Sequence, residues 1–178
     1  MSPPCVDSSR EPRTARKRCT GTATETIPSP RSLTRTIDAF FAPPAVTRAI
    51  VHTSEGDMEW AFFTDEAPQT VKNFATLAAR GYFDSLRVHR VVPDFVIQDG
   101  DPTGTGSGGP GWTIRCEYNR LRYETGMVGM ALSGKDTGGS QFFMVLSEQN
   151  TRHLNGVHTV FGKVTHGLDV MQKIKQTS

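Results

Sequence analysis

Residues 88–101 combine side-chain types that are rarely found together in a strand. This stretch reads Val-His-Arg-Val-Val-Pro-Asp-Phe-Val-Ile-Gln-Asp-Gly-Asp, and its β-branched residues predict two short strands around a Pro-Asp turn. In that arrangement Arg90, Phe95 and Gln98 bring a fixed cation, an aromatic wall and an amide close together. Core strands seldom hold Arg or Gln without a partner. We therefore expect a small amphipathic pocket at this hairpin.

Two glycine-rich stretches match nucleotide-binding motifs in part, but their surroundings do not fit. Residues 104–109 follow the pattern G-x-G-x-x-G, yet they precede Pro110 instead of opening a helix, which a dinucleotide site requires. Residues 129–135 match most of a phosphate-binding loop, but Asp136 stands where Ser or Thr must hold magnesium. A carboxylate there would repel the phosphates. We predict no nucleotide and no other cofactor.

Hydrolytic and metal chemistry are also poorly supported. Ser133 and Ser140 lie in glycine-rich stretches without the G-x-S-x-G turn that presents a nucleophile. The 5 histidines show no paired metal-ligand spacing, and the 3 cysteines are scattered along the chain. We expect no metal site and no disulfide framework. Scattered cysteines favour a reducing, cytoplasmic location.

The distribution of charge argues against nucleic-acid and membrane partners. The net charge is +2 over 178 residues, and residues 1–46 carry seven basic against four acidic side chains. The remainder is nearly neutral and has no basic stripe, so we expect no nucleic-acid partner. No apolar run approaches the ~18 residues of a membrane span, and no hydrophobic segment begins the chain. We therefore expect no membrane partner and no secretory signal.

Composition divides the chain at about residue 45. Residues 1–45 hold seven of the 11 prolines together with many Ser, Thr and Arg, which predicts a disordered tail or linker. A stretch rich in Arg and Ser is also typical of a transit peptide, and its apolar residues 36–41 could dock on the domain that follows. Residues 46–178 are predicted to form that single domain.

Residue periodicity predicts a mainly β fold for this domain. In addition to the pair around Pro93, strands are predicted at residues 49–53, 58–63, 127–132, 141–146 and 159–164. One helix is expected to begin near Pro68, which would lie in its first turn, and to end at Gly81. A second, short helix carries Leu168, Met171 and Ile174 on one side. Many short strands with two helices indicate a β-barrel or sandwich closed by helices.

Four separated blocks of the sequence resemble the cyclophilins, a family of peptidyl-prolyl cis-trans isomerases. The blocks are residues 89–101, 129–131 and 138–143, and then residues 154–156 together with 160–162, in the family's order and approximate spacing. The resemblance implies an antiparallel eight-stranded β-barrel capped by two helices. It also implies that the protein catalyses rotation about X-Pro bonds in peptides and unfolded proteins and so assists protein folding. The resemblance further implies a monomer. A cyclophilin-like module that binds proline-containing segments without turnover is the alternative.

The same resemblance assigns roles to residues around the hairpin. Arg90 is implied to be the central catalytic residue, with Phe95 and Gln98 as its catalytic neighbours. Phe95, Phe143 and Leu154 would form a hydrophobic cup for the substrate proline. The other residues implied to bind substrate or to line the site are Gln141, Ala131, Leu132, His158, His153, Val96 and Gly106. Rotation makes and cuts no bond, which agrees with the lack of a nucleophile, a base or a metal.

The chain departs from the family pattern at several residues near the site, among them Val88 and Asp99, and at its end. His153 stands where many members carry a tryptophan that contacts cyclosporin, so we expect weak cyclosporin binding. Val96 replaces a frequent methionine, and Leu132 with Ser133 replaces a polar pair, which should reshape the subsite before proline. Family members also have a strand after the last helix. Either further chain or the N-terminal residues would have to supply it here.

Overall fold

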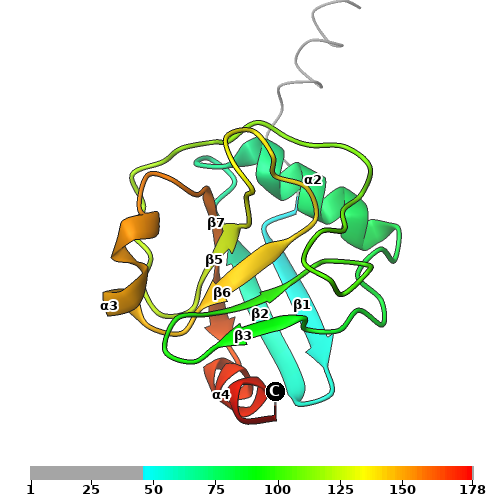
Figure 1. Cartoon of the computed structure of the whole chain (residues 1–178), viewed down its shortest axis with the longest axis vertical. Coiled ribbons are helices and arrows are strands. Elements are labelled where there is room, and N and C mark those ends of the chain that lie inside the picture. The colour runs from blue at the N-terminus through cyan, green and yellow to red at the C-terminus, as the bar shows by residue number, and fades with distance from the viewer. Residues whose placement is uncertain (1–45, 178) are drawn as a thin grey trace, which may run out of the picture. The chain divides into compact units, whose positions relative to one another are not determined.

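The computed structural model describes residues 46–177, and the predicted tail at residues 1–45, with its apolar stretch, lies outside the described residues. One antiparallel sheet of seven strands curls into a half-barrel (Figure 1). Its strands are β1 Arg48–Thr53, β2 Gly56–Phe62, β3 Arg90–Val92, β4 Val96–Asp99, β5 Met127–Met130, β6 Phe142–Val145 and β7 Val160–His166. They pair in the order β1-β2-β7-β5-β6-β4-β3. The prediction of a mainly β, antiparallel, barrel-like fold is confirmed.

β1 and β3 are the edge strands of this sheet within the described residues. The additional strand that the resemblance implies is not among them. A hollow of about 800 Å³ opens beside β1 and residues 83–88, and the rings of Phe74, Phe83 and Phe142 line part of it. Within residues 46–177 the half-barrel is therefore open on this side, where the resemblance implies a closed barrel.

The predicted hairpin forms as expected. β3 and β4 pair antiparallel across the Pro93-Asp94 turn, and the register sets Arg90 opposite Gln98. Asp94 adopts a φ of 59°, a left-handed conformation that Asp tolerates better than β-branched residues do. The Asn150 side chain donates a hydrogen bond to the Asp94 carbonyl oxygen (2.8 Å). The turn is thus held from outside the hairpin as well as from within.

Helix α2 (Pro68–Ala79) begins with proline in its first turn, as predicted. The preceding acids do not cap it, because no acidic residue lies in its first turn and Ala67 stands at the N-cap. Glu117, from a distant loop, accepts hydrogen bonds from the Gln69 and Thr70 backbone N–H groups (2.9 and 2.7 Å) and from the Thr70 hydroxyl (2.7 Å). The helix N-terminus is therefore satisfied by a tertiary contact.

Helices α2 and α4 (Leu168–Thr177) are the two that the sequence predicts, and they lie at opposite ends of the sheet in Figure 1. The described residues contain two more short segments, α3 (Glu148–Thr151) and η1 (Arg152–Leu154). Such short segments show no helical periodicity, so the sequence could not predict them. Within residues 46–177 no helix is long and apolar enough to cross a membrane.

Two hydrophobic clusters fill the structure. The larger one packs α2 and α4 against the sheet and contains Trp60, Phe74 and Phe142, whose rings contact one another at centroid distances of 5.2 to 5.7 Å. The smaller one contains Val96, Tyr123, Met127, Phe143, Val145, Leu154 and Val160. Three predicted site residues belong to the smaller cluster, so the site is built on packed core.

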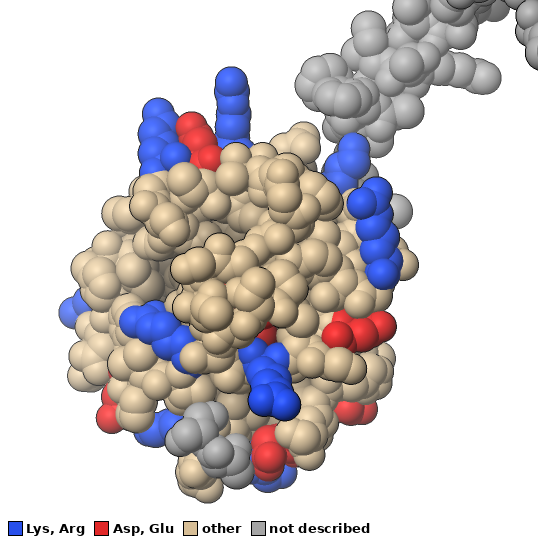
Figure 2. All heavy atoms as spheres, turned by 45° about the vertical axis from the view of Figure 1, so that its right-hand side comes forward, with Lys and Arg blue, Asp and Glu red and all other residues tan. Residues whose placement is uncertain are grey.

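Surface charge is mixed on the face seen in Figure 2, where Lys and Arg lie beside Asp and Glu. The uncharged part of that face is large and is hollowed. Ion pairs link opposite charges elsewhere on the surface, as in Lys163–Glu124 (3.0 Å) and Arg48–Glu59 (3.0 Å). A face of this kind has no continuous basic surface of the type that tracks a phosphate backbone.

Candidate active site

The β3–β4 hairpin presents Arg90 to solvent while fixing its guanidinium. Arg90 Nη1 donates a hydrogen bond of 2.9 Å to Gln98 Oε1 across the two strands. The register makes these residues direct cross-strand neighbours, which is the closest placement two strands offer. The cation is therefore held by a neutral acceptor and keeps its full charge.

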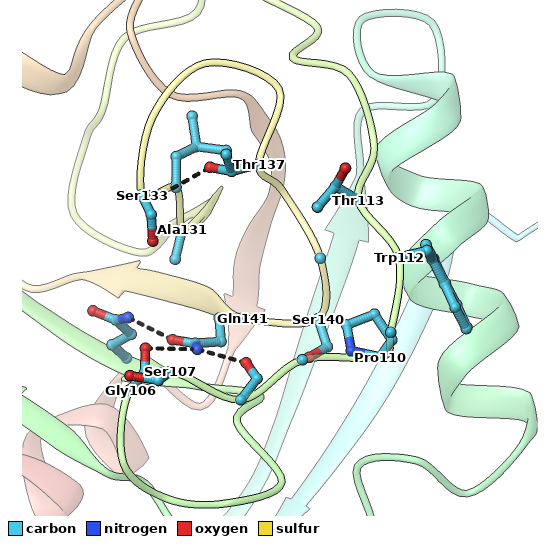
Figure 3. A pocket seen from close by; sticks show the side chains of 16 residues that line it. Gly106, Ser107, Pro110, Trp112, Thr113, Ala131, Ser133, Thr137, Ser140 and Gln141 are labelled. Carbon is cyan, nitrogen blue, oxygen red and sulfur yellow. Dashed lines mark hydrogen bonds between the residues drawn. The ribbon is translucent and has the colours of Figure 1, made fainter.

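A second amide extends this contact to the next strand. Gln98 Nε2 donates to Gln141 Oε1 at 2.9 Å, and Gln141 directly precedes β6, the strand that pairs with β4. Gln141 Nε2 in turn donates to the carbonyl oxygens of Gly106 and Gly108 (3.0 and 2.8 Å), and Figure 3 shows Gly106 on the loop beneath Gln141. The sheet thus aligns Arg90, Gln98 and Gln141 in one hydrogen-bonded row.

The apolar residues predicted to hold a proline ring do come together. Phe143 on β6 and Leu154 on η1 are 4% and 9% exposed and belong to the smaller hydrophobic cluster, and the half-buried Phe95 packs against it. Phe95 is placed by the turn, where its N–H donates to the Val92 carbonyl oxygen (3.1 Å). A turn, a strand and a short helical segment therefore supply one apolar surface.

Two histidines complete the walls of this surface. The His153 ring is exposed and stacks on Phe95, with centroids 5.6 Å apart and planes 12° apart. The His158 ring meets Phe143 edge-on at 5.6 Å, and its Nδ1 lies 3.2 Å from the Met130 carbonyl oxygen. Both predicted residues therefore contact the aromatic side chains of the cup.

The remaining predicted residues lie at different depths. Val96 is 2% exposed and packs inside the smaller cluster, so it supports the cup from behind. Ala131 packs against the same cluster, and its N–H donates to the Gln141 carbonyl oxygen (3.0 Å). Leu132 and Gly106 line the neighbouring pocket. Their roles toward substrate remain predictions.

A pocket of about 450 Å³ adjoins the site and shares Gln98, Gln141 and Ala131 with it. Figure 3 shows its two sides: the loop with Ala131, Ser133 and Thr137 faces the segment with Pro110, Trp112 and Thr113. Trp112 is anchored to α2 by its indole N–H, which donates to Asn73 Oδ1 (2.9 Å). The pocket is thus a second, more polar recess next to the apolar cup.

One buried carboxylate organises the glycine-rich loop below the pocket. Asp101 is 1% exposed and accepts hydrogen bonds from the Thr103 N–H and hydroxyl (2.7 and 2.8 Å), from the Thr105 N–H (3.0 Å) and from the Gly106 N–H. Burial alone would raise the pKa of the Asp101 carboxyl. The hydrogen bonds from Thr103, Gly108 and Gly106 outweigh burial and hold this pKa well below its usual range.

Sequence reasoning missed Asp101, Trp112 and Tyr123. Tyr123 is fully buried behind Phe143, at a centroid distance of 5.3 Å, and burial raises the pKa of its phenol. The run Asp-Pro-Thr-Gly at residues 101–104 is a turn signal that could have indicated Asp101. Trp112 and Tyr123 lie in segments without secondary structure, where periodicity gives no information.

Metal and disulfide chemistry find no support among the described residues. In residues 46–177 no group of three or more His, Cys, Asp or Glu side chains is arranged to hold a metal ion. Cys116 is a free thiol, and its sulfur accepts a hydrogen bond from the Asp136 N–H (3.2 Å). What the site offers is one oriented cation, neutral amides and an apolar cup.

Comparison with known proteins shows the family of this chain. Residues 48–178 match the family model described as cyclophilin type peptidyl-prolyl cis-trans isomerase/CLD. Peptidyl-prolyl cis-trans isomerase B of Bacillus subtilis is 56% identical over 114 residues, which cover 63% of this chain and 78% of that protein. A peptidyl-prolyl cis-trans isomerase of Helicobacter pylori is 48% identical over 132 residues, 72% of this chain and 80% of that protein.

Solved structures agree with the sequence comparisons. A cyclophilin type peptidyl-prolyl cis-trans isomerase of Cryptosporidium parvum superposes with a TM-score of 0.70 at 34% identity, covering 74% of this chain and 85% of that one. A second structure of that protein, determined in the presence of the dipeptide Ala-Pro, gives a TM-score of 0.68 at 34% identity, covering 72% and 85%. Sequence, fold and site chemistry converge, and the chain belongs to the cyclophilin-type peptidyl-prolyl cis-trans isomerases.

Proposed function

We propose that the isomerase activity of this chain resides at Arg90, Phe95 and Gln98. An X-Pro bond rotates only when amide resonance is broken, at a barrier of about 20 kcal/mol, so unaided rotation takes tens of seconds or longer. The twisted state differs from both planar states in one respect that an enzyme can recognise. Its prolyl nitrogen is more pyramidal and has a lone pair available as an acceptor.

Arg90 fits this transition state. A guanidinium directed at the prolyl nitrogen stabilises the twisted amide more than either planar form, and this difference is what accelerates the reaction. Gln98 holds one nitrogen of the guanidinium at 2.9 Å and leaves its charge unneutralised. The hydrogen bond between Arg90 and Gln98 is the single observation that carries the proposal, because it orients a charged donor without pairing it.

The apolar cup supplies the positioning. Phe95, Phe143 and Leu154 would grip the pyrrolidine ring, so that the residue before proline does the rotating. That preceding segment would then extend toward the adjoining pocket, where Leu132 and Gly106 lie. The Cryptosporidium parvum relative was crystallised with Ala-Pro, which supports a proline-containing peptide as the ligand class. Proline and its neighbours are the part of a substrate that such a site can read.

The test is a protease-coupled proline-peptide assay of Arg90→Ala against Arg87→Ala. Arg87 is an exposed arginine three residues upstream, outside the cup, and its replacement is the matched control. We expect Arg90→Ala to lower kcat/KM by about 100- to 1000-fold, the usual loss when a transition-state donor is removed. Near-normal turnover of folded Arg90→Ala would overturn the assignment and favour a module that binds proline segments without turnover.

The other expectations for this protein are proposals as well. We propose a cytoplasmic monomer with a separate N-terminal extension at residues 1–45, no nucleic-acid or membrane partner and weak affinity for cyclosporin. The scattered cysteines support a reducing compartment, and the nearly neutral charge after residue 46 argues against a nucleic-acid partner. The family resemblance supports a monomer, and His153 in place of a tryptophan supports weak cyclosporin binding. Sedimentation equilibrium and fractionation of cells that express the tagged chain test the first two.

A further inference from the structure

The carboxylate of Asp101 determines where the carbonyl groups of the glycine-rich loop point. Four hydrogen bonds from Thr103, Thr105 and Gly106 converge on its two oxygens. Gly106 reaches its place with a φ of 85°, and a Cβ on Gly108 would overlap the carboxylate. The loop is therefore wrapped around Asp101 so closely that only glycine fits at residue 108.

The loop passes this order on to Gln141. The carbonyl oxygens of Gly106 and Gly108 both accept from Gln141 Nε2, at 3.0 and 2.8 Å. An amide side chain has one donor end and one acceptor end. Because two carbonyl oxygens hold the donor end, Gln141 must turn its oxygen toward Gln98.

The direction of the hydrogen bonds is then fixed as far as Arg90. Gln98 donates to the Gln141 oxygen (2.9 Å) and so keeps its own oxygen for the guanidinium, which can only donate. Reversing either amide would set two donors or two acceptors face to face. The orientation of Arg90 thus depends on which way Gln141 points, and that direction depends on the loop.

We propose that Asp101 is a positioning residue for Arg90, acting through the Gly106 and Gly108 carbonyl groups, Gln141 and Gln98. This inference rests on the proposed role of Arg90. Asp101 is 1% exposed and therefore out of reach of a substrate, so it acts by keeping the loop carbonyl groups directed at Gln141. The groups that donate to Asp101 are three backbone N–H groups and one hydroxyl. Its negative charge therefore binds the donors of the loop and does not pair with the Arg90 cation.

The test compares Asp101→Asn with Asp99→Asn. Asp99 lies two residues earlier, at the end of β4, and its carboxylate accepts from the Gly100 N–H (2.7 Å) and not from the loop. Asp101→Asn should lower kcat/KM about tenfold. A catalytic group misplaced by about 1 Å can cost about 100-fold, and we expect a smaller displacement of Arg90 because Gln98 still holds it. Asp99→Asn should leave it unchanged. Equal rates for wild type and folded Asp101→Asn would overturn the inference.

A double-mutant cycle separates positioning from a general loss of stability. If Asp101 acts through Gln141, then Asp101→Asn combined with Gln141→Ala should fall no more than about twofold below Gln141→Ala alone. Independent effects would multiply instead, and that result would refute the mechanism. The side-chain amide resonances of Gln141 and Gln98 should also move in Asp101→Asn toward those of a solvated glutamine. Unmoved resonances would refute it equally.

A milder variant keeps the test open if Asp101→Asn does not fold. Thr103→Val removes one donor from an exposed loop position and retains the carboxylate. It should lower kcat/KM about twofold and lose that effect in the Gln141→Ala background; a normal rate or an additive loss would count against the inference. Its failure is distinct from a failure of the proposed function, because Arg90→Ala would still be inactive.

Discussion

Glu117 should contribute more to the stability of helix α2 than the acidic residues next to that helix. Its carboxylate accepts the Gln69 and Thr70 N–H groups and the hydroxyl of Thr70, whose residue is fully buried. A hydrogen bond to a charged group contributes about 1.5–3 kcal/mol. Because the three bonds share one carboxylate, their sum overstates the loss, and we expect Glu117→Ala to cost about 3 kcal/mol.

The expected loss follows from what remains after the substitution. Glu117→Ala leaves the buried Thr70 hydroxyl and two helix N–H groups to water or to no partner. Glu117→Gln keeps one acceptor oxygen and should cost about 1.5 kcal/mol. In a domain of this size, about 3 kcal/mol corresponds to a fall in Tm of roughly 10 °C.

Urea unfolding followed by far-UV circular dichroism measures both variants, with Glu66→Gln as the matched control. Glu66 is an exposed acid directly before the N-cap residue Ala67, and the helix has no acidic residue in its first turn. We expect Glu66→Gln to change the free energy of unfolding by less than about 0.5 kcal/mol. A loss below about 1 kcal/mol for Glu117→Ala, or an equal loss for Glu66→Gln, would refute the tertiary cap.

Two further predictions concern the site and its loop. His153 offers cyclosporin only a small ring stacked on Phe95, so His153→Trp, with its larger surface and indole donor, should tighten cyclosporin inhibition at least about tenfold; unchanged inhibition would contradict this. The folded-state pKa of Asp101 lies below its ordinary value of 3.8, so its stabilising effect is complete above about pH 5 and declines as the pH falls below about 4. Asp101→Asn should therefore be less stable than wild type at pH 7 and more nearly equal to it at pH 3, as urea melts at the two pH values will show; a difference that does not change with pH would contradict the assignment.

The start of α2 illustrates what sequence alone can predict. Pro68 in the first turn and the glycine stop after Ala79 are local signals, and the structure confirms both: the Gly81 N–H donates to the Ala78 carbonyl oxygen (2.9 Å) at a φ of 68°. The cap is not local, because Glu117 lies 47 and 48 residues away from the groups it accepts. Tertiary packing also decides which side of α2 is buried: Leu77 is buried, whereas the neighbouring Ala78, which is also apolar, is exposed.

Two residues of the glycine-rich motifs, Ser140 and Gly129, have packing roles in the structure. Ser140 is 2% exposed, and its hydroxyl donates to the Gly100 carbonyl oxygen (2.6 Å). These contacts fit a structural role and not that of a nucleophile. A Cβ on Gly129 would overlap the rings of Tyr123 and Phe143. Glycine is needed there so that Tyr123 can lie behind the proline cup, a contact that no local pattern encodes.

The site itself was predictable as a list of residue types but not as a directed arrangement. Arg90 and Gln98 are eight residues apart, and their pairing follows from the hairpin alone. Gln141 is 43 residues from Gln98, and Gly106 is 35 residues from Gln141, so their alignment requires the strand order β6-β4-β3 and the loop around Asp101. That separation has a chemical consequence. A carboxylate in direct contact with Arg90 would fix the guanidinium equally well but would compete with the prolyl nitrogen for its donors. Two neutral amides between the cation and Asp101 transmit orientation while leaving the positive charge available to the twisting amide.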